Sequence, residues 1–252
     1  ASRGIWFVRD EAALTMALQE LDASDAFAGE VLAQDLVAGP TEKAQAVFSR
    51  GKLLGFHAYR QIAAGVGGGE AIKQSVRRPA LRADIATIGE RLGWHGAMSV
   101  DTIMPEQGSH RFIDCNPRLV EPMSAYLAGL DLVDLLLRVS QGKTPEPAPD
   151  SREDVRTHLA MQALLGCAAR HGTRRETFRE CVRLIAGRGP YAGSVEELTP
   201  LRRDWISAVP LAMIALALLA DPKLATALSK KGWGAHLLGA ESIRLIEGEK
   251  FP

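Results

Sequence analysis

Short runs of apolar residues alternate with polar stretches over roughly the first 150 positions, a pattern that predicts strands interspersed with helices. The strand-like runs are residues 31–37, 44–48, 53–59, 96–103 and 110–115. Arg50-Gly51-Lys52 predicts a hairpin turn between the second and third runs, and the polar residues 105–109 predict a turn between the last two. We therefore expect an antiparallel sheet in this part of the chain.

Helical spacing marks three further segments in the same part of the chain, at residues 11–21, 79–92 and 124–140. In the second of these, apolar residues recur at Leu81, Ile85 and Ile88, and Gly93 follows in the position of a C-cap. Residues 65–69 include four glycines, whose ordering costs much conformational entropy. We expect that segment to be a loop.

The pattern changes after the proline-rich residues 144–149, beyond which we expect helix throughout. The predicted helices are residues 152–171, 174–186, 201–220 and 222–230. The apolar run from Trp205 to Ala220 is interrupted by Pro210 and is shorter than the roughly twenty residues of a membrane span. We read it as a buried core helix and expect no membrane partner. The sequence thus predicts an α+β fold, an antiparallel sheet with helices followed by an all-α extension.

Composition narrows the class of protein. The 30 Lys and Arg residues balance the 30 Asp and Glu residues, and 46% of the chain is hydrophobic, which argues against a disordered chain and against a globally basic nucleic-acid binder. The balance conceals unequal halves, with 15 basic and 19 acidic residues up to position 150 and 15 and 11 after it. Three widely spaced cysteines do not make a disulfide framework, so we expect reduced thiols and a cytoplasmic location.

The last two predicted strands carry the candidate chemistry. Because side chains alternate along a strand, Asp101 shares a face with Ile103, and Asp114 shares a face with Asn116. If these strands pair, two carboxylates and an amide oxygen converge, and such hard oxygen ligands suit Mg²⁺. Arg118 follows at the strand end, where its guanidinium suits a phosphate or a developing oxyanion. Solvation or helix capping is the competing explanation for the aspartates.

These motifs resemble the C-terminal lobe of the ATP-grasp family of carboxylate-amine and carboxylate-thiol ligases. The strongest is Asp114-Cys115-Asn116-Pro117-Arg118, which follows an acidic strand at Asp101 and precedes Ala128-Gly129-Leu130-Asp131-Leu132. Residues 31–39 and the glycine-rich loop add to the likeness. It covers about residues 1–143, so it implies that 1–29 are the tail of the N-terminal lobe, that 30–143 are the C-terminal lobe, and that the helical extension at 150–252 lies outside the family fold.

The resemblance implies a nucleotide site. Gln34, Asp35 and Val37 would belong to the hinge between the lobes, which reads adenine. Glu42 would bind the ribose hydroxyls, and Ile103 would form an apolar wall of the purine pocket.

The resemblance also implies where the phosphates lie. Asp101, Asp114 and Asn116 would hold the magnesium ions that bridge the phosphates of ATP. Arg118 would stabilise an acyl phosphate or the tetrahedral intermediate that follows it. Arg60 and Lys73 would reach the phosphates or the substrate, with ordinary surface charge as an equal alternative. Glu121 is expected to cap the following helix rather than touch substrate.

The implied reaction is phosphoryl transfer from ATP to a small-molecule carboxylate, followed by attack of an amine or similar nucleophile. We expect the chain to lack the N-terminal part of the fold and to be inactive alone. A non-catalytic nucleotide-binding or protein-interaction module is the alternative. The sequence is also compatible with assembly into a homo-oligomer.

Overall fold

The computed structural model describes residues 6–67, 69–106, 108–199 and 204–232. Its centre is a seven-stranded sheet in the order β5-β4-β1-β2-β3-β6-β7, antiparallel except for the β6–β7 pair. The strands are β1 (Thr41–Ser49), β2 (Lys52–Ala64), β3 (Glu70–Ser75), β4 (Gly96–Ile103), β5 (Arg111–Asn116), β6 (Arg156–His158) and β7 (Val195–Glu196). The helices are α1 (Glu11–Ala23), α2 (Pro79–Leu92), α3 (Met123–Leu127), α4 (Leu132–Ser140), α5 (Ala160–His171), α6 (Arg174–Ala186), α7 (Ala208–Ala220) and α8 (Leu224–Gly232). The predicted α+β class is confirmed.

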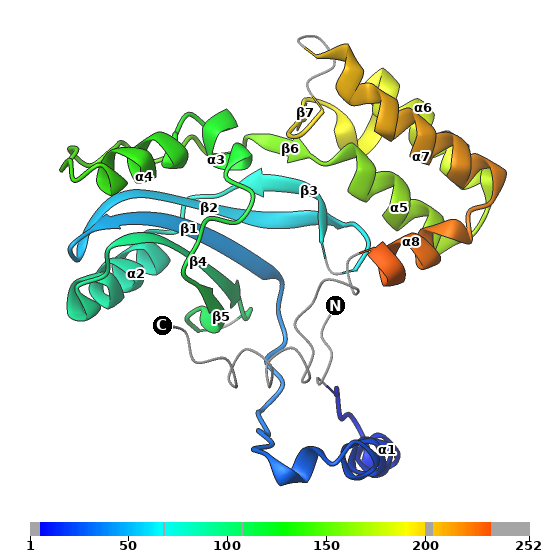
Figure 1. The fold of residues 1–252 in the computed structure, drawn as a ribbon, viewed down its shortest axis with the longest axis horizontal. Helices are drawn as coiled ribbons and strands as arrows, with labels where there is room; N and C mark the ends of the chain where they lie inside the picture. The colour runs from blue at the N-terminus through cyan, green and yellow to red at the C-terminus, as the bar shows by residue number, and fades with distance from the viewer. Residues whose placement is uncertain (1–5, 68, 107, 200–203, 233–252) are drawn as a thin grey trace, which may run out of the picture.

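Helix α2 covers one face of the sheet, and α3 and α4 cover the other (Figure 1). The predicted spacing in α2 is confirmed, because Leu81 and Ile85 are buried against Phe48 of β1 in one apolar core. Gly89 allows the Phe48 ring to approach the helix, since a Cβ at Gly89 would lie 2.1 Å from a ring carbon. Gly93 ends the helix with a φ of 57°, as its C-cap position predicts.

The single helix predicted over residues 124–140 is wrong. The chain forms two helices there, and Gly129, with a φ of 93°, lies in the turn between them. The second helix begins at a new cap, because the Asp131 side chain accepts a hydrogen bond from the backbone N–H of Asp134. The break lets Leu130 and Leu132 pack under the sheet together.

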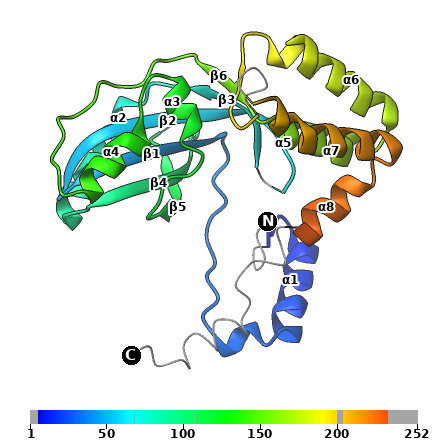
Figure 2. The same ribbon diagram turned by 45° about the horizontal axis from the view of Figure 1, so that its top comes forward.

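The strand predicted over residues 31–37 is also wrong. Residues 29–40 form no helix or strand, and Figure 2 shows them as part of the long connection between α1 and β1. Leu32 and Leu36 are 79% and 61% exposed. Apolar content alone does not make a strand, because a strand needs a neighbour for its backbone hydrogen bonds.

The extension after residue 150 is not helical throughout. Residues 156–158, predicted as helix, pair with β3 as β6, and β7 pairs with β6 in parallel. Helices α5 to α8 then pack beside this end of the sheet (Figure 1).

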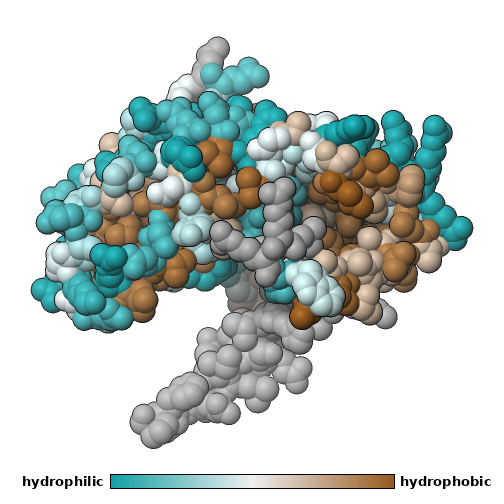
Figure 3. Space-filling view, turned by 90° about the horizontal axis from the view of Figure 1, so that it is seen from above, coloured by the Kyte–Doolittle hydropathy of each residue, from teal (hydrophilic) through white to brown (hydrophobic). Residues whose placement is uncertain are grey.

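Helix α7 is not the buried core helix expected from its apolar sequence. Leu218 is buried among the helices, but Met213 and Leu216 are 65% and 67% exposed. Figure 3 shows apolar side chains gathered over the helical part, at the right of the view. Among the described residues, no helix is long and apolar enough to cross a membrane.

Candidate functional site

The structure brings the three predicted metal ligands to one face of the sheet. Asp101 of β4 lies directly opposite Asp114 of β5, and Asn116 lies opposite Ser99, two residues before Asp101. The Asn116 amide donates to Asp114 Oδ2 at 2.7 Å, which leaves its carbonyl oxygen as the free end of that side chain. β5 is an edge strand, and Asp114 is exposed. Ile103 lies on the same face as Asp101 and is half-buried.

A lysine that the sequence analysis did not single out lies beside these acids. Lys43 of β1 is opposite Asp101, with its Nζ 3.4 Å from Asp101 Oδ2 and 2.7 Å from Glu70 Oε1. Burial alone would lower the pKa of Lys43, but its hydrogen bond and charge interaction with Glu70 raise it. Burial raises the pKa of Asp101, although Lys43 counteracts this. The face therefore has a fixed cation next to the paired aspartates.

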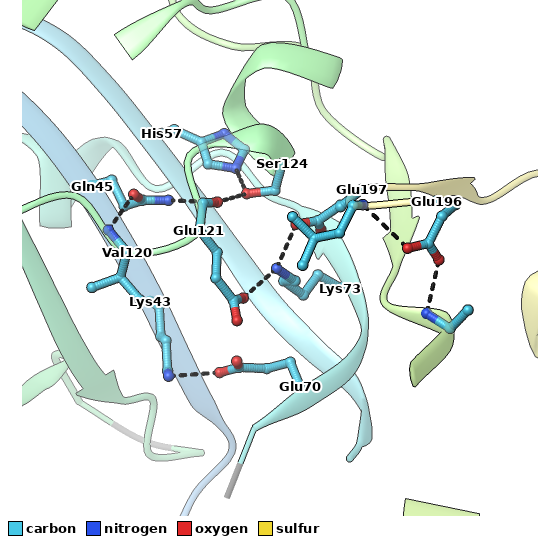
Figure 4. Close-up of polar contacts among 12 residues, drawn as sticks. Lys43, Gln45, His57, Glu70, Lys73, Val120, Glu121, Ser124, Glu196 and Glu197 are labelled. Carbon is cyan, nitrogen blue, oxygen red and sulfur yellow. Dashed lines mark hydrogen bonds and ion pairs between the residues drawn. The ribbon is translucent and has the colours of Figure 1, made fainter. Parts of the chain in front are cut away.

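Lys73 of β3 is completely buried on the same face (Figure 4). Its ammonium lies 2.5 Å from Glu121 Oε2 and 2.9 Å from Glu197 Oε2, and 5.3 Å from the centre of the Tyr59 ring. Burial raises the pKa of Glu197, and its second oxygen, Oε1, is buried outside hydrogen-bond geometry with any described residue. Of the two alternatives for Lys73, surface charge is wrong, because the side chain is part of an internal ion-pair network, and contact with the phosphates or the substrate stays a prediction.

The loop after β5 is held in place by Gln45 of β1. Its side chain accepts from the Val120 N–H at 2.9 Å and donates to the Glu121 carbonyl at 3.4 Å (Figure 4). Glu121 has a φ of 54°, an uncommon backbone conformation for a residue other than glycine, and its carboxylate turns toward Lys73 instead of capping α3. The expected capping role is wrong.

His57 of β2 contacts α3, the helix that follows this loop, and the segment after residue 150. It lies within hydrogen-bond distance of the hydroxyls of Ser124 and Ser151, at 3.3 Å and 2.9 Å. Burial, with a smaller contribution from the charge of Lys73, lowers its pKa to about 3. The imidazole is therefore neutral near pH 7.

Arg118 is exposed at the end of β5, and its backbone carbonyl accepts from the Ser99 hydroxyl at 2.7 Å. Since Ser99 lies opposite Asn116, this contact fixes the start of the Arg118 side chain near the paired aspartates. Within the described part of the chain, its guanidinium has no hydrogen-bond or ion-pair partner. The geometry leaves a permanent cation available at the edge of the site.

Two predicted residues lie on the opposite face. Glu42 is 2% exposed, and its carboxylate is bound at both oxygens by Arg78, at 2.5 and 2.6 Å. Arg60 lies opposite Glu42 on β2, and its guanidinium reaches Gln74 at 3.4 Å. The structure does not bring either side chain together with Asp101 and Asp114.

The expected hinge residues lie in the connection before β1. Gln34 and Asp35 are exposed, and Val37 is half-buried. Nothing in the described contacts assigns them a ligand, so their adenine contacts stay a prediction.

The oxygen ligands of Asp101, Asp114 and Asn116 suit Mg²⁺ better than a metal ion whose ligands all come from the protein. Among the described residues, no three His, Cys, Asp or Glu side chains are grouped so that they could hold a metal ion. Two aspartates with an amide oxygen are compatible with Mg²⁺, which binds through one or two carboxylates and takes its other ligands from water and phosphates.

Comparison with known proteins gives partial similarities. No family model matches the chain. Pyruvate carboxylase 1 of Caenorhabditis elegans is 30% identical over 89 residues, which are 34% of this chain and 8% of that protein. The chain therefore spans less than a tenth of the length of this curated relative.

Among solved structures, the chain is similar to the biotin carboxylase domain of Hydrogenobacter thermophilus 2-oxoglutarate carboxylase in complex with MgADP and bicarbonate, with 20% identity over 61% of this chain and 37% of that one and a TM-score of 0.48. For an L-amino acid ligase from Bacillus licheniformis the identity is 16%, the coverage 54% and 36%, and the TM-score 0.37. Biotin carboxylases and L-amino acid ligases are members of the ATP-grasp family, the same family that the sequence motifs resemble.

Proposed function

We propose that this chain is part of an ATP- and Mg²⁺-dependent ligase that activates a carboxylate as an acyl phosphate for attack by an amine or similar nucleophile. The observation that carries the proposal is the facing pair Asp101 and Asp114, with Asn116 and Arg118 following on the same strand end. The sequence resemblance around Asp114 supports it independently. In this proposal residues 30–143 are the nucleotide-binding lobe, and Gln34, Asp35 and Val37 contact adenine.

The roles of the residues follow from their surroundings. Asp101, Asp114 and the Asn116 carbonyl would hold Mg²⁺, which when bound supplies neutralisation of phosphate charge. Lys43 keeps a positive charge 3.4 Å from Asp101, so it limits repulsion between the aspartates before a ligand arrives. The guanidinium of Arg118, which has no partner among the described residues, would offset the charge of the acyl phosphate.

The ion-pair network of Lys73, Glu121 and Glu197 would lie next to the bound substrate. Glu121 is one-third exposed at its side chain, whereas its partner Lys73 is fully buried. A carboxylate in that position could orient an attacking nucleophile by accepting a hydrogen bond from it, and its ion pair with Lys73 would hold it in place. Because Glu197 also pairs with Lys73, the extension contributes a residue to this network.

Nucleotide binding tests the proposal. With Mg²⁺ present, ATP is expected to raise the melting temperature of the protein, and Asp114→Ala is expected to abolish the rise. Asp134→Ala is the matched control and should keep the rise, because it removes an exposed acid on α4 whose carboxylate forms an ion pair with Arg138 alone among the described residues. Loss of the ATP effect in both variants, or in neither, would contradict the assigned site.

A non-catalytic module is the second candidate, favoured by the exposed apolar residues of α7. The two candidates differ in turnover by the whole ligase of which the chain is proposed to be a part, since the chain alone is expected to be inactive. A ligase releases ADP faster when its carboxylate is added, and hydroxylamine traps the acyl phosphate as a hydroxamate. Mg²⁺-dependent ATP binding without either signal, over a panel of carboxylates, would favour the interaction module.

A further inference from the structure

A basic hollow lies at the far end of the sheet from the candidate site. It has a volume of about 490 Å³, within the range of small-molecule pockets. The β1–β2 turn, the loop between α2 and β4, and the segment after α4 surround it, and these meet at the left end of the sheet in Figure 1. The two sites lie at opposite ends of β1: Lys43 is beside the candidate site and Ser49 lines the hollow. The two residues are six positions apart along the strand, or roughly 20 Å.

Three side chains that can carry positive charge line the hollow: Arg50, His95 and Lys143. None of its lining residues is acidic. Within the described part of the chain, Arg50 and Lys143 form no ion pair, unlike the arginines at the start of α2, which pair with Glu42, Asp150 and Glu153. Neither of the two permanent charges in the hollow is therefore neutralised by an ion pair with a described residue.

Arg50 lines the hollow from the first position of the β1–β2 hairpin turn. Arg50 has a φ of 48° and Gly51 a φ of 86°, the left-handed conformations of a two-residue hairpin turn. Asparagine, aspartate or glycine usually occupies the first of these positions, so an arginine there is unfavourable without another role.

Neutral donors complete the site. The Arg50 N–H donates to His95 Nδ1 at 3.3 Å, which leaves His95 Nε2 as the protonated nitrogen. Ser49 is only 8% exposed, lines the hollow, and has a hydroxyl without a hydrogen-bond partner among the described residues. The N–H groups of residues 141–143 donate to carbonyls in the last turns of α4, so these carbonyls have hydrogen-bond partners.

We propose that this hollow binds a small phosphate-bearing anion. Arg50 and Lys143 supply the charge, and His95 and Ser49 supply hydrogen bonds to the phosphate oxygens. The site is independent of the proposed ligase chemistry, because it shares no residue with the metal-binding face.

Titration with inorganic phosphate at constant ionic strength tests the proposal, with chloride as the reference anion. Arg50→Asn removes the charge and retains a residue that favours the left-handed turn, and Lys143→Gln removes the second charge from a loop. Each is expected to weaken phosphate binding about tenfold, while Lys52→Gln, an exposed lysine of the same hairpin outside the hollow, leaves it unchanged.

The proposal would be overturned by absence of phosphate binding in the unmodified protein, by an equal loss in Lys52→Gln, or by retention of full affinity in both hollow variants. Arg118→Ala separates the two sites, because it should leave phosphate affinity unchanged if the hollow is the binding site. Loss in that variant would assign the phosphate to the candidate ligase site and contradict the proposal. A phosphomonoester titrated in parallel distinguishes a phosphorylated metabolite from free phosphate by which of them binds more tightly.

Discussion

The two faces of the central sheet treat their charged side chains differently. Glu42 and Lys43 are neighbours on β1, yet alternation sends them to opposite faces. On the face covered by α2, Glu42 is buried and both of its oxygens are bound by Arg78. On the other face, Lys43 forms an ion pair with Asp101 and Lys73 forms one with Glu197. The exposed Asp114 lies opposite Asp101 on the edge strand.

The two faces differ in whether each charged side chain has hydrogen-bond or ion-pair partners for all of its polar atoms. Both carboxylate oxygens of Glu42 are bound by Arg78, whereas the guanidinium of Arg118 has no partner among the described residues. A fully paired buried charge holds elements together, and an incompletely paired one is available for binding. The comparison therefore separates structural charges from those that we assign to function.

Lys73→Met should have the largest effect on stability. It leaves Glu197, whose side chain is 1% exposed, as an uncompensated buried charge, at a cost of about 3–5 kcal/mol. Urea denaturation at pH 7 measures the loss. The double variant Lys73→Met/Glu197→Leu should recover part of it, and a single variant as stable as the unmodified protein would show that the network is not a structural unit.

Glu42→Gln should destabilise less, by about 1–3 kcal/mol, because Arg78 is partly exposed and water can replace its partner. It should not alter nucleotide binding, since its side chain lies on the α2 face. The same urea series measures the stability. A change in ATP affinity without a change in stability would contradict the assignment of a structural role to the charges on the α2 face.

His57 should make stability depend on pH. Its pKa is lowered from 6.5 to about 3, so the unfolded chain binds the proton first as the pH falls. Its contribution is complete above pH 6.5 and is lost below that value down to about pH 3, with a slope of up to about 1.4 kcal/mol per pH unit. Unfolding at pH 7, 6 and 5 measures this, and His57→Gln should flatten the slope. An unchanged slope would mean that other groups cause it.

The sequence was sufficient where local pattern and pairing agree. Helix α2 with Gly93, strands β4 and β5, and the convergence of Asp101 with Asp114 follow from periodicity and a short turn. The same alternation places Lys43 beside Asp101 once β1 is paired with β4 in the observed register.

Other features depend on contacts distant in the chain. Glu197 lies 124 residues from Lys73, and no local pattern joins them. β6 was missed because three residues show no periodicity, and its strand character comes from the edge of β3. Glu42 was assigned to ribose by resemblance alone, whereas Arg78, 36 residues away, decides its role.

The most direct test of the account compares ATP affinity with and without Mg²⁺ by calorimetry in Asp114→Asn and Glu42→Gln. Asp114 is exposed, so its substitution should change stability by no more than about 0.5 kcal/mol and isolate the binding effect. We predict that Mg²⁺ tightens ATP binding in the unmodified protein and in Glu42→Gln but not in Asp114→Asn. Mg²⁺ dependence that survives in Asp114→Asn, or that disappears equally in Glu42→Gln, would contradict it.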